Sequence, residues 1–189
     1  MATRGLYGLR KNGIDKTSYN HFDSYPDELG RNILSFIKGH SVEEMNAFYN
    51  RIIMVSEQAI PTTQEIENCI INQSIDLNVS TRSYNDWYCL LRYLQGELGA
   101  LYECKISYMI DEHEFIKDSL FCKYAYIINL DTNKLEFYKG FQTKPQKGNR
   151  YGETSLGQFY PCALIAEIPF TLIHHTDIDK IINQFMKED

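Results

Sequence analysis

The sequence lacks any apolar run that approaches the roughly 18 residues of a membrane-spanning helix, and its first residues, MATRG, carry no apolar stretch of a secretory signal. It also contains no P-loop, no G-x-G-x-x-G and no G-x-S-x-G motif. These absences predict a cytoplasmic protein without a membrane partner. They also exclude the nucleotide-binding proteins and serine hydrolases that carry these common signatures.

Signals for disulfides and metals are missing as well. The five cysteines have no C-x-x-C spacing and stand mostly beside apolar or aromatic residues, which predicts reduced core positions: Cys69, Cys89, Cys104, Cys122 and Cys162. The densest metal-capable group is His174-His175 with Asp177 and Asp179, but neighbouring residues of a strand point to opposite faces and Asp177 suits a helix cap. We therefore predict neither a metal nor a cofactor.

Positive charge is in the minority and is concentrated. The chain has 19 Lys and Arg against 25 Asp and Glu, and this net charge of −6 excludes a general nucleic-acid binder. Residues 1–16 hold four bases and one acid, and residues 138–152 hold four bases and no acid, so the remainder carries a net charge of −13. The two basic segments either meet in one anion-binding site or form separate solvated loops.

What is present predicts a single α+β domain over residues 1–189. With 43% hydrophobic residues, the chain can bury a sizeable core. Short aromatic and β-branched segments at 3–10 and 16–22 flank Asn12-Gly13, which predicts a hairpin, and a second hairpin is expected at 122–130 and 134–141. A further strand is expected at 160–170. We predict one antiparallel sheet built from these N-terminal and C-terminal hairpins.

The middle of the chain, roughly 26–118, is predicted to be helical and to pack on that sheet. Pro26 suits the first turn of a helix behind Asp23 or Ser24, and Ser41-Val42-Glu43-Glu44 is a capping box. Further helices are expected from Pro61, with Thr62 or Thr63 near its cap, from Asn85 or Asp86 to Leu101, and after Asp177. Gly96 and Gly99 inside the long helix indicate close packing or a break.

The densest polar and aromatic run, residues 19–26, lies where a strand meets a helix N-terminus, a place that favours anions. If an arginine of the first strand reaches it, guanidinium, imidazole and backbone donors converge beside tyrosines that can stack on a planar ligand. The glycine-bearing loop 142–158 is a candidate lid. The predicted ligand-binding residues are Arg4, Tyr7, Arg10, Tyr19, Asn20, His21, Asp23, Ser24, Tyr25, Lys147 and Arg150. In the alternative interpretation, His21 and Asp23 only cap the helix and brace the hairpin.

Residues 3–16 and 19–26, with 124–131, 137–141 and 160–164, resemble a family of uncharacterised proteins of phages and prophages. The resemblance implies a phage-related source and a host cytoplasmic location, but no activity. A looser likeness is to N-terminal-nucleophile hydrolases, which begin a strand with Cys, Ser or Thr. Here Thr3 follows Ala2, so an active nucleophile requires removal of Ala2 as well as Met1.

Two classes of function follow from these observations. The first is a phage-type, non-catalytic protein, possible as a homo-oligomer, that binds an anionic, nucleotide-like small molecule or a host protein, as in counter-defence. A separate possibility is a purely protein-binding role, in which the acidic remainder of the chain meets a basic host factor or mimics nucleic acid. The alternative is a hydrolase that uses either an N-terminal nucleophile or His21 and Asp23 as acid and base.

Overall fold

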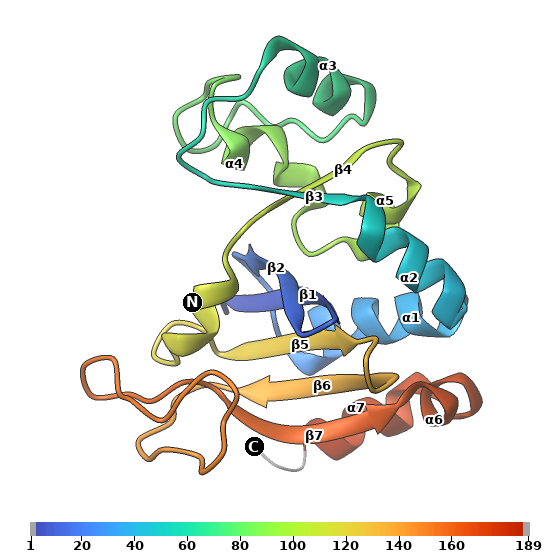
Figure 1. Cartoon of the computed structure of the whole chain (residues 1–189), viewed down its shortest axis with the longest axis vertical. Coiled ribbons are helices and arrows are strands. Elements are labelled where there is room, and N and C mark those ends of the chain that lie inside the picture. Colours follow the sequence, from blue (N-terminus) through green and yellow to red (C-terminus); the bar gives the residue numbers. More distant parts are fainter. Residues whose placement is uncertain (1–2, 187–189) are drawn as a thin grey trace.

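The computed structural model describes residues 3–186, and its centre is a five-stranded sheet in the order β2-β1-β5-β6-β7 (Figure 1). A separate two-stranded sheet pairs β3 with β4. The strands are β1 (Gly5–Lys11), β2 (Ile14–Asn20), β3 (Ile52–Val55), β4 (Ser107–Ile110), β5 (Tyr124–Asn129), β6 (Lys134–Lys139) and β7 (Ala163–Pro169). The α+β class is therefore confirmed.

Both predicted hairpins are present. Asn12 and Gly13 have φ values of 51° and 75°, which is the left-handed pair that a tight turn between β1 and β2 requires. The register places Leu6 opposite Tyr19 and Arg10 opposite Asp15. In the second hairpin, Tyr124 lies opposite Lys139.

The prediction of a purely antiparallel sheet is wrong at one position, because β1 and β5 are parallel neighbours. A parallel pair needs a long crossover connection. The helical middle of the chain is part of that connection, since it joins β2 to β5. Local hairpin signals cannot reveal this pairing, which links residues more than 100 positions apart.

The helices follow their capping signals closely. Ser41 and Thr62 each cap a helix and form a capping box with the glutamate three residues later, and the Asp86 side chain accepts a hydrogen bond from the Tyr88 amide. The helical segments are η1 (Pro26–Gly30), α1 (Arg31–Gly39), α2 (Val42–Arg51), α3 (Thr63–Ile71), α4 (Trp87–Leu90), η2 (Arg92–Leu94), α5 (Leu98–Glu103), η3 (His113–Lys117), α6 (Phe170–His175) and α7 (Ile178–Met186).

Three details of the predicted elements differ. The long helix from Asp86 is broken into α4, η2 and α5: α4 ends at Leu90, and Gly96, with a φ of 84°, separates η2 from α5 where the chain turns against Asn20. The segment Pro26–Gly30 is a π-helix whose N-cap residue gives no side-chain cap, so Asp23 and Ser24 do not cap it. His174 and His175 end helix α6 rather than a strand.

The sheet packs on both of its faces. Tyr7, Leu9, Tyr126 and Phe137 point into the main core, which also contains the apolar side of α1 and residues of α6 and α7. The other face carries a smaller core, formed by Leu6, Ala125, Ile127, Tyr138, Cys162 and residues beside η3. All five cysteines are free and buried, as predicted. Among residues 3–186, no helix is long and apolar enough to cross a membrane.

Figure 1 shows that α3, α4, β3 and β4 form a second layer above the sheet. We call this part, residues 52–110, the upper lobe. The chain enters this lobe from α2 and leaves it through the segment between β4 and η3. The N-terminal ends of β1 and β5 and the C-terminal end of β6 meet at one edge of the sheet, which we call the strand-end edge.

Candidate functional site

The predicted site residues do not converge on one place. Arg10 lies at the hairpin turn, whereas Arg4 lies at the strand-end edge, six residues and therefore about 20 Å away along the strand. Arg150 and Lys147 belong to the loop that covers the hairpin-turn end. The two basic segments therefore meet where the Tyr151 hydroxyl bonds to Asp15, at the opposite end of β2 from His21.

Where the basic segments touch, their charges are already neutralised. Arg10 forms a 2.8 Å ion pair with Asp15, and Arg150 grips the buried carboxylate of Glu136 with two hydrogen bonds of 2.9 and 2.6 Å. The Tyr151 hydroxyl joins the two pairs, because it accepts from Arg150 and donates to Asp15. This network fixes the loop to the sheet and leaves neither arginine free for a ligand. The adjoining cavity of about 320 Å³ includes Lys147, Glu136 and Glu167 in its lining.

Asn20, Asp23 and Ser24 have structural roles at the crossover from β2 to η1. The buried Asn20 side chain donates to the Ser24 hydroxyl and to the Phe22 carbonyl. Ser24 is fully buried, and its carbonyl accepts from the Tyr126 hydroxyl. A cavity of about 210 Å³ opens beside Asn20, and Asp23, Glu28 and Glu97 line it together with the single base Arg92. This lining is unsuited to an anion.

His21 sits in a cationic surrounding. Its Nδ1 shares a 2.7 Å hydrogen bond with the Tyr19 hydroxyl, not with Asp23. Burial lowers the pKa of His21, and the nearby charges of Arg4 and Arg92 lower it further. The imidazole is thus held in its neutral form near pH 7. Within residues 3–186, no hydrogen bond joins His21 to Asp23.

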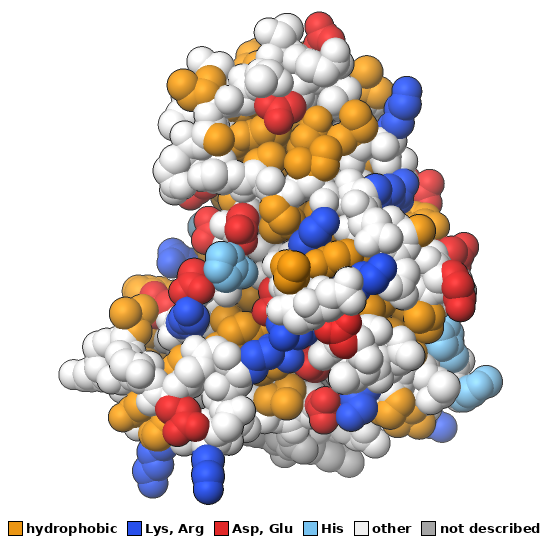
Figure 2. Space-filling view, in the orientation of Figure 1, with side chains coloured by type: hydrophobic (Ala, Val, Ile, Leu, Met, Phe, Trp, Pro, Cys, Tyr) orange, Lys and Arg blue, Asp and Glu red, His pale blue; other side chains and the backbone are white. Residues whose placement is uncertain are grey.

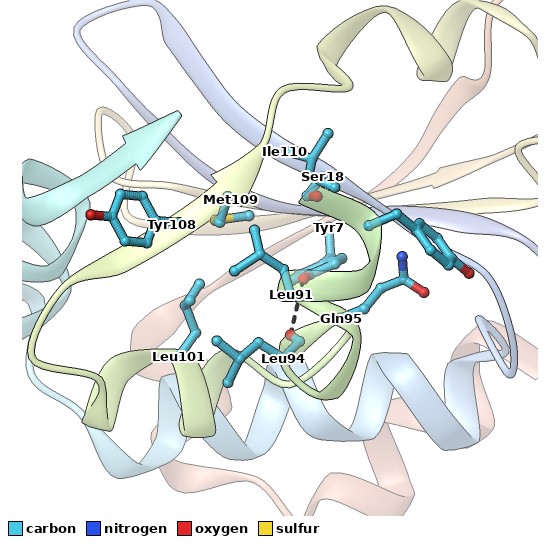
Figure 3. Close-up of a pocket in the computed structure, with 10 residues that line it drawn as sticks. Tyr7, Ser18, Leu91, Leu94, Gln95, Leu101, Tyr108, Met109 and Ile110 are labelled. Carbon is cyan, nitrogen blue, oxygen red and sulfur yellow. Dashed lines mark hydrogen bonds between the residues drawn. The ribbon is translucent and has the colours of Figure 1, made fainter. Parts of the chain in front are cut away.

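Tyr7 belongs to the core. Figure 3 shows its hydroxyl pointing to the Leu94 carbonyl, at 3.3 Å, beside a cavity of about 20 Å³. A space of this size has room for about one water molecule. Burial raises the pKa of Tyr7 to about 12. Its role is packing between the sheet and the upper lobe.

A better-shaped cavity lies at the strand-end edge. Its volume is about 330 Å³, and it is lined by Thr3, Tyr25, Lys123, Tyr124, Lys139, Gly140 and Phe141. We call it the strand-end pocket. Two lysines and three aromatic rings line it, and no acidic residue does among the described residues. Its volume falls in the range of small-molecule sites, about 300–1,000 Å³.

The bases of this pocket come from neighbouring strands. The Lys123 amide donates to the Arg4 carbonyl at 3.0 Å, and the Gly140 amide donates to the Lys123 carbonyl at 2.8 Å. Arg4, Lys123 and Lys139 therefore stand at the ends of β1, β5 and β6, side by side across the sheet. Within residues 3–186, Arg4 and Lys123 form no ion pair, and burial lowers the pKa of Lys123. An unpaired, partly buried ammonium group favours a bound anion.

The aromatic rings at this edge are held in fixed positions. The Lys123 ammonium lies 3.4 Å from the centre of the Phe141 ring, and the Arg4 guanidinium lies 5.5 Å from that of Phe121. Phe141 has a φ of 60°, which a bulky residue adopts only when its surroundings hold it there. Its amide donates to the Ser119 carbonyl at 2.7 Å. The ring stays 53% exposed despite this strain.

Of the predicted site residues, only Tyr25 lines the strand-end pocket, and Arg4 lies beside it. Sequence reasoning missed Lys123, Lys139 and Phe141, which the pattern presented only as ends of a hairpin. One signal was available: Lys123 and Lys139 flank the two hairpin strands at the same end, so the sequence places a basic residue beside each strand end.

Comparison of the chain with protein-family models, with curated protein sequences and with solved structures gives no match. Within residues 3–186, no group of three or more His, Cys, Asp or Glu is arranged to hold a metal ion. A function is therefore inferred from the geometry and charge of the chain's own residues.

Proposed function

We propose that the protein binds a small anionic ligand with a planar aromatic ring, such as a nucleotide, in the strand-end pocket. The carrying observation is the position of Lys123, an ammonium group without an ion-pair partner among residues 3–186, against the exposed ring of Phe141. A phosphate or carboxylate of the ligand supplies a counter-charge to Lys123, whose ammonium group has lost part of its hydration by burial. Tyr25 and Phe141 offer faces on which a planar ring stacks.

Each part of the pocket contributes a separate interaction. Lys123 and Lys139 attract the anionic group, and Arg4 adds positive potential from the neighbouring strand. The rings give the apolar surface that a nucleobase needs, and Thr3 offers a hydroxyl for a hydrogen bond. Such a ligand is held by charge at one end and by stacking at the other. Neither inorganic phosphate nor a free nucleoside satisfies both.

The resemblance to phage proteins gives this binding a biological setting, which we propose as capture of a nucleotide-derived signal of the host. The setting rests on the resemblance in residues 3–16 and 19–26 and on the chemistry of the pocket. The competing proposal is that a host protein, and not a small molecule, binds at the strand-end edge.

Titration calorimetry with adenosine 5′-monophosphate, adenosine and inorganic phosphate tests the binding. We expect the nucleotide to bind at least about tenfold more tightly than either fragment. Lys123→Ala removes one charge-assisted contact, worth about 1.5–3 kcal/mol, and so weakens nucleotide binding by about 10- to 100-fold. Lys105→Ala, at an exposed lysine of the upper lobe, is the matched control and leaves binding unchanged. Equal affinities for all three compounds contradict the proposal.

A hydrolase is the second candidate, and one observation favours it: Thr3 lines the strand-end pocket. If processing exposes Thr3 as the first residue, its hydroxyl stands beside the bound ligand, and its amine can serve as the base. Intact-mass analysis of the purified protein decides between the candidates. A chain that begins at Ala2 excludes this nucleophile, and a chain that begins at Thr3 calls for turnover assays.

A further inference from the structure

The upper lobe exposes large apolar side chains that its own fold does not use. In α3 the only buried residue is Cys69, while Ile70 and Ile71 at the end of the helix are 54% and 70% exposed. Tyr84 and Tyr93 are 46% and 58% exposed. Figure 2 shows hydrophobic side chains gathered on this lobe, whereas acidic and basic side chains are interspersed with hydrophobic ones over the lower part of the molecule.

Three of these side chains, Ile70, Tyr84 and Tyr93, border one groove. Its volume is about 470 Å³, and its lining is Ile70, Gln73, Ile75, Leu77, Tyr84 and Tyr93. None of the lining residues is charged. Aliphatic walls with two tyrosines are the composition of a protein-binding hot spot, in which aromatic rings contribute most of the contact energy. We call this feature the upper groove.

The charge around the upper groove selects the partner. Residues 56–93, which contain the whole lining of the groove, hold five acids and two bases, so this segment has a net charge of −3. Asp76 stands between two lining residues, and Glu67 lies one helical turn before Ile70 and Ile71. Hydrogen bonds from Thr81 outweigh the effect of burial and lower the pKa of Asp86 to about 2, which keeps that carboxylate charged.

We propose that the upper groove binds an amphipathic helix of another protein whose apolar side is flanked by lysine and arginine. An amphipathic helix presents apolar residues at i, i+3, i+4 and i+7, and such a row fits a groove of this composition. The basic flanks meet the acidic segment. A second copy of this chain is disfavoured as the occupant, because a twofold contact brings two copies of this acidic segment together.

This inference rests on the upper lobe and is independent of the ligand proposed for the strand-end pocket. The test uses two synthetic helical peptides that carry leucine on one face. One carries lysine on the other face and the second carries glutamate there, and fluorescence anisotropy measures the binding of each peptide. We expect the lysine peptide to bind the full-length protein at least about tenfold more tightly than the glutamate peptide. Equal binding of the two peptides overturns the proposal.

Variants show whether the peptide binds in the groove. Ile70→Ser combined with Tyr93→Ser is expected to weaken binding of the lysine peptide by at least about tenfold. The matched control, Leu172→Ser with Leu156→Ser, alters two side chains that are 50% and 61% exposed outside the upper lobe and leaves binding unchanged. Lys123→Ala also leaves it unchanged, which separates this result from that of the strand-end pocket. Unaltered binding by the groove variant overturns the proposal.

A measurement on the unmodified protein guards against a variant that does not fold. On addition of the lysine peptide, we expect slower amide hydrogen exchange in residues 70–93 and no change in residues 123–141. Protection that is absent from 70–93, or that lies over the sheet, contradicts the proposed position.

Discussion

Arg150→Ala is expected to destabilise the protein more than the loss of any surface ion pair. Glu136 is 3% exposed and receives four hydrogen bonds: two from Arg150, one from Asn129 at 2.7 Å and one from Tyr138 at 3.0 Å. The variant removes the two charge-assisted bonds and leaves a buried carboxylate with neutral donors only. At about 1.5 kcal/mol for each bond, the expected loss is about 3 kcal/mol.

Urea unfolding measures this loss of free energy, and thermal unfolding measures the matching fall in Tm; circular dichroism follows both. For a chain of this size, about 3 kcal/mol corresponds to a fall in Tm of about 9 °C. Lys134→Ala is the control, because it breaks a 3.3 Å pair with Glu167 whose side chains are 35% and 40% exposed. That pair is expected to contribute less than about 1 kcal/mol.

The pH dependence gives the argument a second check. Burial alone raises the pKa of Glu136, but the hydrogen bonds from Arg150 and Asn129 outweigh it, so that the pKa lies below its ordinary value of 4.5. This group therefore stabilises the protein above its unfolded pKa, and that stabilisation is lost as the pH falls through the folded pKa. In Arg150→Ala, burial dominates and raises the pKa. The destabilisation should thus be largest near pH 7 and shrink below about pH 4.5. A loss under about 1 kcal/mol at pH 7, or one that does not shrink in acid, refutes this reasoning.

Three further outcomes are expected. Gly140→Ala places a Cβ 2.0 Å from the Cys122 carbonyl oxygen, so thermal unfolding should show a loss of about 2 kcal/mol or more, with displacement of Phe141; an unchanged Tm contradicts the close approach. Because the pKa of His21 is lowered in the folded state, His21 contributes a loss of stability as the pH falls below about 6.5, and His21→Gln should show a shallower acid limb in unfolding titrations. Nucleotide affinity should decrease as the pH rises from 7 toward the ordinary lysine pKa of 10.5, because Lys123 loses its proton earlier than a free lysine; calorimetry with Lys123→Ala, which lacks this decrease, is the control.

Local chemistry made much of the fold predictable. The Asn12-Gly13 turn, the Ser41 capping box and the Asp86 cap all act within four residues, and the structure confirms each. Tyr7 and Leu9 face one core and Leu6 faces the other, as the alternation of side chains along a strand requires. Such turn and capping signals are visible in the sequence because the residues involved lie next to the helix or strand that they begin or end.

The rest depends on contacts between distant residues. The parallel pairing of β1 with β5 brings Arg4 beside Lys123, and no local pattern indicates that neighbour. Arg150 and Arg10 were expected to bind an anion, but Glu136 and Asp15 already neutralise them, and only the register of the strands shows this. For the same reason, the candidate site lies at the strand-end edge of the sheet and not at the predicted position. Tyr25 remained because it stands at the edge where three strands end.

The most direct test of the central claim is a nuclear magnetic resonance titration of the ¹⁵N-labelled protein with adenosine 5′-monophosphate. We predict the largest amide shifts at Tyr25, Lys123, Gly140 and Phe141, with little change in the upper lobe, and we expect Lys123→Ala to suppress them. Shifts centred on Arg10 and Arg150, or no shifts as the nucleotide approaches its solubility limit, contradict the strand-end pocket as a site for an aromatic anion.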